Sequence, residues 1–167
     1  MELRQLESGI WLAEAALAGR TGHAAGRALL ERLYFHVTGE ALPPVVVAEG
    51  GKPHFSGSPW HFSITHTPRR AFCALAPFPV GIDAEETDRD INLRLAEKIL
   101  SPGERAQFDS AMDKRMALLT FWVLKEAEAK RTGLGLRGYP NGTDFSLADP
   151  RVTRWKDCLL AVTFNQN

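Results

Sequence analysis

The sequence predicts an α/β protein of two similar lobes, in each of which a helix packs on a small, mostly antiparallel sheet. Each half of the 167-residue chain runs from a segment with helical spacing to short apolar strands. The first half contains a predicted hairpin, and the last strand, 158–164, is almost entirely apolar, which is typical of a central strand. The two halves are too dissimilar in sequence to establish an internal duplication.

The first half of the chain contains one predicted helix and a predicted hairpin. Residues 10–17 form a short apolar piece with weak boundaries, and glycines in 22–26 interrupt its pattern. Apolar residues then recur at helical spacing from Arg27 until Gly39, which is a typical helix terminator. Turns rich in proline and glycine, including a turn at 50–53, separate three predicted strands. These strands cover 45–48, 60–66 and 71–76.

The second half begins with an acidic strand at 80–86 and then becomes mainly helical. A helix is predicted over 91–100. Ser101 and Glu104, with proline between them, have the form of a capping box and predict a new helix running toward Met112. The longest helical pattern covers 114–132 and ends at glycine. Further strands are predicted at 144–147, 152–155 and 158–164.

Composition and charge indicate one cytoplasmic domain. The 20 Lys and Arg residues balance 20 Asp and Glu residues, so bulk charge does not indicate a nucleic-acid partner and any anion site must be local. Two distant cysteines fit a reduced protein. There is no signal-peptide pattern, and no apolar stretch approaches the roughly 20 residues needed to span a bilayer. We expect a single domain over 1–167, with an N-terminal lobe of about 1–76, a C-terminal lobe of about 77–167 and no membrane partner.

Two carboxylates lie on one face of the predicted strand 80–86. Because successive side chains of a strand point to opposite faces, Asp83 and Glu85 should face the same way, while Ile82 and Ala84 face the core. Adjacent carboxylates repel each other unless a cation lies between them, and oxygen ligands suit Mg²⁺ better than a soft metal. A solvated acidic turn is the alternative interpretation of an isolated Asp-x-Glu pattern.

Trp122, Glu126 and Lys130 are spaced four apart and lie along one ridge of the longest predicted helix. The ordinary interpretation of Glu126 and Lys130 is a surface pair worth about 0.2–0.5 kcal/mol. Apolar residues precede the pair on this ridge, however, so the ridge starts out buried and is suited to a site. Glu126 could give a third oxygen to a cation held by Asp83, and Lys130 could meet phosphate oxygens that the cation does not reach.

Four short motifs occur in order along the chain with compatible gaps. They are Gly51-Lys52-Pro53, Phe62-Ser63-Ile64-Thr65-His66-Thr67, Gly81-Ile82-Asp83-Ala84-Glu85, and Phe121-Trp122-x-x-Lys125-Glu126-Ala127-x-x-Lys130 followed by Gly133 and Gly135. From Arg27 onward the chain thus resembles the surfactin-synthetase-activating (Sfp-type) 4′-phosphopantetheinyl transferases, whose patterns are G-K-P, F-N-x-S-H-S, G-x-D-x-E and W-x-x-K-E-x-x-x-K-x-x-G-x-G. Ser63 stands where the family prefers asparagine, Thr65 and Thr67 replace serines, and the basic residues often found before Arg27 are largely missing.

This resemblance implies a fold, a reaction and its partners. The fold would have two lobes related by a pseudo-twofold axis, with coenzyme A bound in the cleft between them. The reaction would transfer the phosphopantetheine arm of coenzyme A to a serine of an apo acyl or peptidyl carrier protein, with release of adenosine 3′,5′-bisphosphate and a requirement for Mg²⁺. The carrier could serve fatty-acid, polyketide or nonribosomal peptide synthesis. We expect a monomer, because a two-lobed chain can complete its own site.

The resemblance also assigns the catalytic and metal-binding residues. Asp83, Glu85 and Glu126 match the family's metal-binding carboxylates. Lys130 matches the lysine that stabilises or protonates the departing diphosphate oxygen. Either Glu126 or a water held by these carboxylates would be the base for the carrier serine, and the sequence leaves that choice open.

Four residues match coenzyme A contacts of the family. His66 matches a histidine that contacts phosphate, and Thr65 beside it keeps a hydroxyl for hydrogen bonding to phosphate. Arg27 resembles an arginine that reaches the 3′-phosphate, and Lys52 matches the lysine of the G-K-P motif near the nucleotide. Without the family, His66 would be interpreted as a structural histidine, Arg27 as solvated and Lys52 as a surface residue.

Several neighbouring residues have ordinary structural interpretations. Lys125 is expected at the surface, and the capping box alone explains Glu104. Arg69 and Arg70 are either anion contacts or turn residues. Tryptophans 60 and 155 are expected in the core.

Two other functions remain as alternatives. One is a non-catalytic module of the same fold that binds a carrier protein or coenzyme A, although retention of the three carboxylates and Lys130 argues against it. The other is a Mg²⁺-dependent nucleotide phosphohydrolase, which would need no carrier protein.

Overall fold

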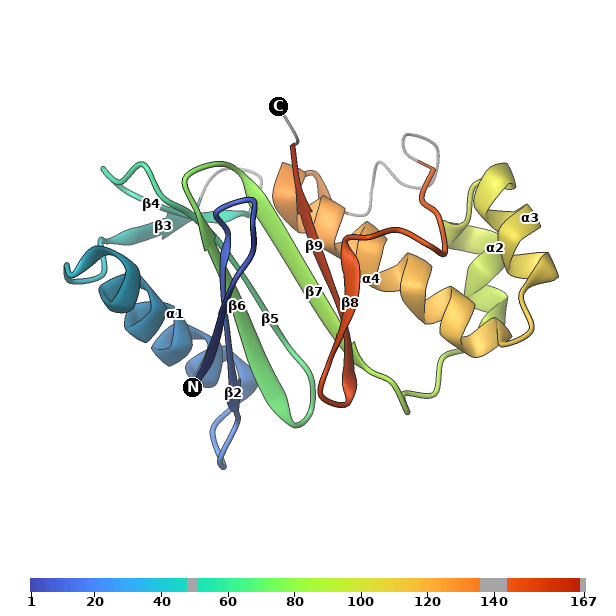
Figure 1. Cartoon of the computed structure of the whole chain (residues 1–167), viewed down its shortest axis with the longest axis horizontal. Helices are drawn as coiled ribbons and strands as arrows, with labels where there is room; N and C mark the ends of the chain where they lie inside the picture. Colours follow the sequence, from blue (N-terminus) through green and yellow to red (C-terminus); the bar gives the residue numbers. More distant parts are fainter. Residues whose placement is uncertain (48–50, 136–143, 166–167) are drawn as a thin grey trace.

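The computed structural model describes residues 1–47, 51–135 and 144–165. Its elements confirm an α/β protein built from small antiparallel sheets and helices (Figure 1). In chain order they are β1 (Glu2–Gln5), β2 (Trp11–Ala16), α1 (Gly22–Thr38), β3 (Val45–Val47), β4 (Pro53–Phe55), β5 (His61–His66), β6 (Arg70–Ala76), β7 (Val80–Glu86), the 3₁₀ turn η1 (Leu93–Leu95), α2 (Ala96–Ile99), α3 (Pro102–Ser110), α4 (Lys114–Thr132), β8 (Val152–Trp155) and β9 (Cys158–Phe164).

The described strands form two main sheets and a small ribbon. Strands β1-β2-β6-β5 form a four-stranded sheet, β7-β9-β8 form a three-stranded sheet, and β3 pairs with β4. All of these pairings are antiparallel. The nearly all-apolar strand β9 is central in its sheet, as its sequence predicts. The four-stranded sheet lies entirely before residue 77 and the three-stranded sheet entirely after it.

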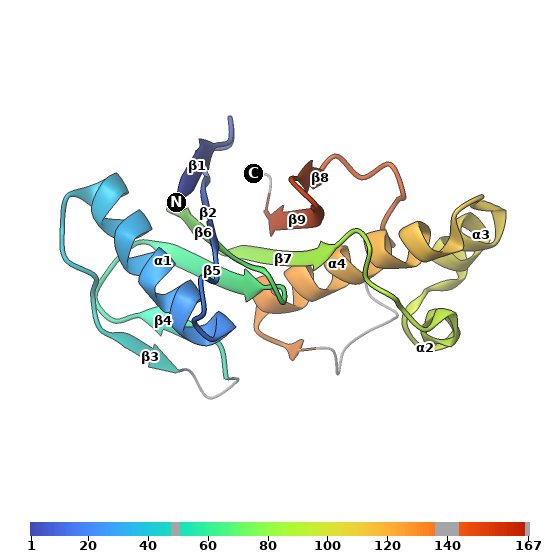
Figure 2. The ribbon, with the colours of Figure 1, turned by 90° about the horizontal axis from the view of Figure 1, so that it is seen from below.

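Each of the two main sheets has one long helix packed on it. Helix α1 packs on β2, β5 and β6, and α4 packs on β7 and β9. Figure 2 shows α4 running along β7, while α1 lies beside β5. Apolar side chains from β2 and β6 also share a core cluster with those of β7 and β9. The two sheets are therefore held together by buried apolar contacts that do not involve α1 or α4. Strands β5 and β7 lie side by side where the two sheets meet.

Helix α1 begins earlier than the sequence predicts. It starts at Gly22, with the Thr21 hydroxyl accepting a hydrogen bond from the backbone of Ala24, so the expectation that 22–26 interrupts the structure is wrong. A Cβ atom at Gly22 would lie 2.3 Å from the His66 ring, and one at Gly26 would lie 2.5 Å from a methyl group of Ile64. The two glycines therefore allow α1 to approach β5 closely. The helix ends at Gly39, as predicted.

Local signals define the helices of the second half more accurately. The capping box of α3 is present, with Ser101 Oγ accepting from the backbone of Glu104 and the Glu104 carboxylate accepting from the backbone of Ser101. Helix α4 has the predicted bounds and ends at Gly133, which has a left-handed backbone. The helix predicted over 91–100 is only a 3₁₀ turn followed by the single turn α2, which ends where the backbone becomes extended at Leu100, just before the Ser101 cap of α3.

Three strand predictions were incomplete or wrong. Residues 10–17 contain β2, the second strand of a hairpin with β1. The sequence did not indicate whether this segment is a helix or a strand. Strand β4 begins at the last residue of the turn predicted at 50–53, in a stretch for which the sequence predicted no strand. Residues 144–147 form no strand, because the backbone N–H groups of Phe145 and Leu147 donate to the side chains of Glu104 and Gln107 on α3 instead of to a neighbouring strand.

Candidate active site

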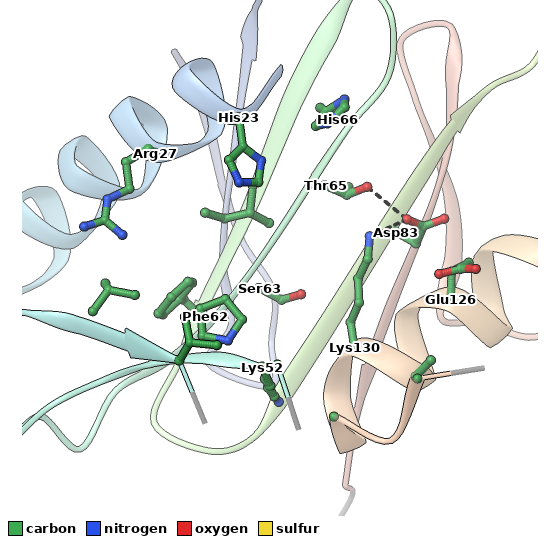
Figure 3. Close-up of a pocket in the computed structure, with 18 of the residues that line it drawn as sticks. His23, Arg27, Lys52, Phe62, Ser63, Thr65, His66, Asp83, Glu126 and Lys130 are labelled. Atoms are coloured by element: carbon green, nitrogen blue, oxygen red, sulfur yellow. Dashed lines mark hydrogen bonds and ion pairs between the residues drawn. The ribbon is translucent and has the colours of Figure 1, made fainter. Parts of the chain in front are cut away.

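A single cavity contains every site residue that the sequence identifies. Its volume is about 1160 Å³, and it is lined by α1, β5, β7, α4 and the segments leading to them (Figure 3). That volume is slightly above the range typical of ligand sites, about 300–1,000 Å³. The predicted residues that line it are Arg27, Lys52, Thr65, His66, Asp83, Glu85, Glu126 and Lys130.

Basic side chains on one wall of this cavity face carboxylates on the other, where Lys130 of α4 is paired with Asp83. The side formed by α1 and β5 contributes the basic residues His23, Arg27 and His66, while β7 and α4 contribute carboxylates such as Asp83 and Glu126. Figure 3 shows Asp83 and Glu126 close together across from His23 and Arg27. Such a cavity can bind an anion on one wall while the carboxylates of the other wall hold a cation or accept a proton.

Helix α4 lies directly against β7 because Gly81, the glycine of the G-x-D-x-E motif, has no side chain. A Cβ atom at Gly81 would lie 1.9 Å from the carbonyl oxygen of Ala127 and 2.6 Å from the backbone nitrogen of Arg131. Only glycine allows this approach of two backbones. It brings the helix residues Glu126 and Lys130 next to the strand residue Asp83.

Asp83 is a buried carboxylate with two donors on one oxygen. Thr65 Oγ1 donates to Asp83 Oδ1 at 2.9 Å, and Lys130 Nζ lies 2.6 Å from the same atom. The second oxygen, Oδ2, is buried and has no hydrogen-bond partner among the described residues. Burial raises the pKa of Asp83, although Lys130 and Thr65 favour the charged form.

Glu126 is half-buried on α4 and faces Asp83. Its pKa is raised, first by burial and then by the negative charge of Asp83. A carboxylate whose pKa is raised is a stronger base than one in open water. Because Asp83 is buried and already held by Lys130 and Thr65, the half-buried Glu126 is better placed to accept a proton from a bound hydroxyl group.

Glu85 is held by two side chains outside the strand. Its Oε1 atom accepts a hydrogen bond from Trp122 Nε1 at 3.2 Å and forms an ion pair with Arg89. Trp122, which the sequence suggested only as a buried residue of the α4 ridge, thus orients a predicted metal ligand. A tryptophan N–H has no acceptor role, so a nearby carboxylate is its natural partner.

The three carboxylates do not form a preassembled metal site. No group of three or more His, Cys, Asp or Glu side chains within the described parts of the chain lies close enough to hold a metal ion. Lys130 and Arg89 each pair with one of the carboxylates instead. The residues nevertheless fit a hard divalent cation, because three carboxylates line one cavity and Asp83 Oδ2 is a buried acceptor without a donor.

The G-K-P motif connects the first lobe to the end of α4. Lys52 Nζ donates to the backbone carbonyl of Arg131, in the last turn of the helix, at 2.5 Å. Its Cβ atom would be 3.3 Å from a Cβ added at Gly133. Burial and the nearby Arg131 charge lower the pKa of Lys52. Lys52 is thus half-buried in the cavity wall, and its interpretation as a simple surface residue is wrong.

Other residues near the motifs lie outside the cavity. Lys125, predicted at the surface, is buried and paired with Glu104, and neither residue lines the cavity. Arg69 and Arg70 also lie outside it and form ion pairs with acidic residues that include Glu86 and Glu14, so they are not anion contacts of this cavity. Trp155 is buried in the core cluster between the two sheets, and Trp60 is partly exposed and packs against the separate cluster under α1.

Sequence reasoning missed His23. This residue is in the first turn of α1 and lines the cavity beside Arg27. The signal was a histidine four residues before Arg27, which places both side chains on one helix face. It was overlooked because the helix was expected to begin only at Arg27.

Comparison with known proteins gives one family. Residues 79–164 match the model of the 4′-phosphopantetheinyl transferase superfamily. The 4′-phosphopantetheinyl transferase Sfp of Bacillus subtilis (strain 168) is 37% identical over 92 residues, which cover 53% of this chain and 40% of that protein. The 4′-phosphopantetheinyl transferase psf-1 of Bacillus pumilus is 37% identical over 122 residues, which cover 67% of this chain and 52% of that protein.

A third relative, the 4′-phosphopantetheinyl transferase gsp of Aneurinibacillus migulanus, is 32% identical over 90 residues, which cover 53% of this chain and 37% of that protein. The chain therefore spans about half, or less, of the length of the curated relatives it matches. Among the described residues, no helix is both long and apolar enough to cross a membrane.

Proposed function

The chain belongs to the 4′-phosphopantetheinyl transferase superfamily, whose model matches more than half of its length, and on that premise we propose that it transfers the 4′-phosphopantetheine arm of coenzyme A to a serine of an apo carrier protein. The observation that carries this proposal is the single cavity with basic residues on one wall and Asp83 and Glu126 on the other. Coenzyme A offers the phosphates for the first wall and the reacting diphosphate for the second.

The basic wall binds the phosphates of coenzyme A in this proposal. Arg27, Lys52 and His66 contact phosphate oxygens, and His23 adds a further donor beside Arg27. Charged donors to phosphate make stronger hydrogen bonds than neutral ones. These contacts fix the diphosphate so that its reacting phosphorus faces the carboxylates across the cavity.

The opposite wall provides proton transfer. The carrier serine hydroxyl attacks the phosphorus that bears the pantetheine arm, Glu126 or a water next to it takes the hydroxyl proton, and the bond to the bridging oxygen breaks. Lys130 stabilises or protonates that departing oxygen, which leaves as part of adenosine 3′,5′-bisphosphate. Mg²⁺, when bound by Asp83, Glu85 and Glu126, would supply neutralisation of the diphosphate charge.

The decisive experiment is incubation of the protein with coenzyme A, Mg²⁺ and a panel of apo acyl and peptidyl carrier proteins, followed by intact mass spectrometry. Addition of one phosphopantetheine arm to a carrier, and none to the same carrier with its serine changed to alanine, supports the proposal. Coenzyme A binding without any transfer indicates a non-catalytic module. Release of phosphate or phosphopantetheine without a carrier indicates a phosphohydrolase.

We also propose that the protein acts as a cytoplasmic monomer. The support for a monomer is that all eight predicted site residues line one cavity of a single chain, so no second copy is needed to complete that cavity. Light scattering during size-exclusion chromatography tests this, and a mass twice the 18.5 kDa of the chain would contradict it.

A further inference from the structure

The two lobes are joined at the cavity by side-chain hydrogen bonds between β5 and β7. These strands belong to different sheets. Ser63 Oγ accepts from the backbone nitrogen of Ile82 at 3.1 Å, and two residues further along β5, Thr65 Oγ1 donates to Asp83 Oδ1 at 2.9 Å. Ser63 and Thr65 are each 6% exposed and Asp83 is 5% exposed, so solvent does not compete for these bonds.

The hydroxyl group of Thr65 has a single proton to donate. In this structure the acceptor of that proton is Asp83, which lies on the other lobe. Thr65 therefore cannot donate to a phosphate of coenzyme A while it donates to Asp83. We propose that Thr65 is a positioning residue that orients the Asp83 carboxylate, in place of the phosphate contact that the family resemblance implies.

The geometry around Asp83 shows what this orientation achieves. Thr65 and Lys130 both hold Oδ1, so rotation of the carboxylate is restricted, and Oδ2 remains the buried acceptor without a partner among the described residues. Residues that hydrogen-bond a metal-binding carboxylate set its orientation and its readiness to bind. Threonine suits this role better than serine, because its β-branched side chain has fewer rotamers.

Ser63 strengthens the same arrangement. Its bond to Ile82 fixes the residue before Asp83, so β5 holds both the backbone and the side chain of this part of β7. The first lobe thus determines the position of a carboxylate that belongs to the second lobe. Thr65 acts on the reaction through Asp83, and its own hydroxyl makes no contact with the substrate.

Isosteric variants test this role. Thr65→Val removes the hydroxyl and keeps the shape, whereas Thr65→Ser keeps the hydroxyl. We expect Thr65→Val to weaken Mn²⁺ binding, measured by electron paramagnetic resonance, and to lower kcat. A loss of about 10–100-fold in metal affinity or activity is typical of such a change. The Kd for coenzyme A, measured by calorimetry, should stay within about twofold, because Thr65 makes no phosphate contact. Thr65→Ser should restore both the metal affinity and kcat.

A matched control is Thr120→Val on α4. The Thr120 hydroxyl is also buried and donates to a backbone carbonyl of its own helix, but it lies outside the cavity. Its loss should leave Mn²⁺ binding, kcat and coenzyme A affinity unchanged. If Thr65→Val does not fold, Thr65→Ala provides the same comparison without the branched group.

The inference would be overturned if Thr65→Val left Mn²⁺ binding and kcat unchanged, and a tenfold or greater loss of coenzyme A binding in that variant would assign Thr65 to the phosphate instead. Its kcat readout rests on the proposed function, but the two binding measurements do not. A wild-type protein that modifies no carrier would therefore refute the proposed transferase, while the effect of Thr65→Val on Mn²⁺ binding would still decide the role of Thr65.

Discussion

The ammonium nitrogen of Lys125 lies 2.7 Å from a carboxylate oxygen of Glu104, and these side chains are only 1% and 0% exposed. The Glu104 carboxylate also accepts hydrogen bonds from the backbone nitrogens of Ser101 and Phe145. One buried carboxylate thus joins α3, α4 and the segment that begins after residue 143. The next residue of α4, Glu126, lines the cavity, so this pair helps to set the rotation of the helix that carries Glu126.

Lys125→Met should destabilise the protein strongly. The substitution leaves Glu104 buried without its cation, and breaking a buried pair in this way costs about 3–5 kcal/mol. Urea unfolding measures the loss. The control is Lys98→Met on α2, where the lysine is exposed and the change should stay within about 0.5 kcal/mol. Equal stability of the two variants would contradict the structural role of the pair.

Gly81→Ala should separate α4 from β7. The new methyl group would lie 1.9 Å from the backbone carbonyl of Ala127, which cannot move without the helix. Overpacking of this kind costs about 1–3 kcal/mol or more, and we expect carrier modification to fall with it. Thermal unfolding and the transfer assay measure these effects.

Gly103→Ala is the matched control for Gly81→Ala. Here the added Cβ atom would meet the end of the Asp144 side chain at 2.6 Å, and that carboxylate can rotate away. Alanine is also better than glycine in a helix by about 0.5–1 kcal/mol. If both variants lost stability equally, the close approach at Gly81 would not be the cause.

Glu126→Gln should abolish transfer while the protein stays folded. The side chain is half-buried on the cavity wall, so the amide fits, but it can neither accept the serine proton nor carry the charge of a metal ligand. We expect a loss of about 10²–10⁴-fold in rate, measured by the mass of the carrier over time. Glu128→Gln, on the same helix but outside the cavity, should retain activity. A Glu126→Gln variant with most of its activity would refute the site.

His66→Ala should raise the requirement for coenzyme A. Loss of one charge-assisted bond to phosphate costs about 1.5–3 kcal/mol, which corresponds to a KM increased about tenfold or more with a smaller effect on kcat. Initial rates at varied coenzyme A concentration separate the two constants. His54→Ala, on an exposed position of β4 outside the cavity, should leave both unchanged. An unaltered KM in His66→Ala would rule out the phosphate contact.

Removal of divalent metal by a chelator should stop transfer, and added Mg²⁺ should restore it. The reason is that Lys130 and Arg89 pair with only two of the three carboxylates in the cavity, and the proposed metal would neutralise the diphosphate charge that these carboxylates repel. Carrier modification measured before chelation, with chelator, and after Mg²⁺ is returned checks this. Undiminished transfer in excess chelator would show that the carboxylates act without a metal.

Local sequence signals were sufficient for much of this protein. The capping box at Ser101 and the glycine after Thr132 predicted where α3 begins and where α4 ends, because caps depend on neighbours only a few residues away. The apolar run of β9 predicted a central strand. Four ordered motifs named seven residues that line one cavity, Arg27 was added from the helix before them, and together they indicated the family to which the chain belongs.

Only the tertiary structure decided the features that depend on distant partners. Gly22 cannot carry a side chain because the His66 ring of β5 lies against it, Lys125 is buried because α3 provides Glu104, and Thr65 is directed to Asp83 because β5 meets β7. Periodicity shows which face of an element is apolar, but it does not show what packs there. The environment of a charged or hydroxyl side chain is set by groups far along the chain, so its role becomes visible only when those groups are placed beside it.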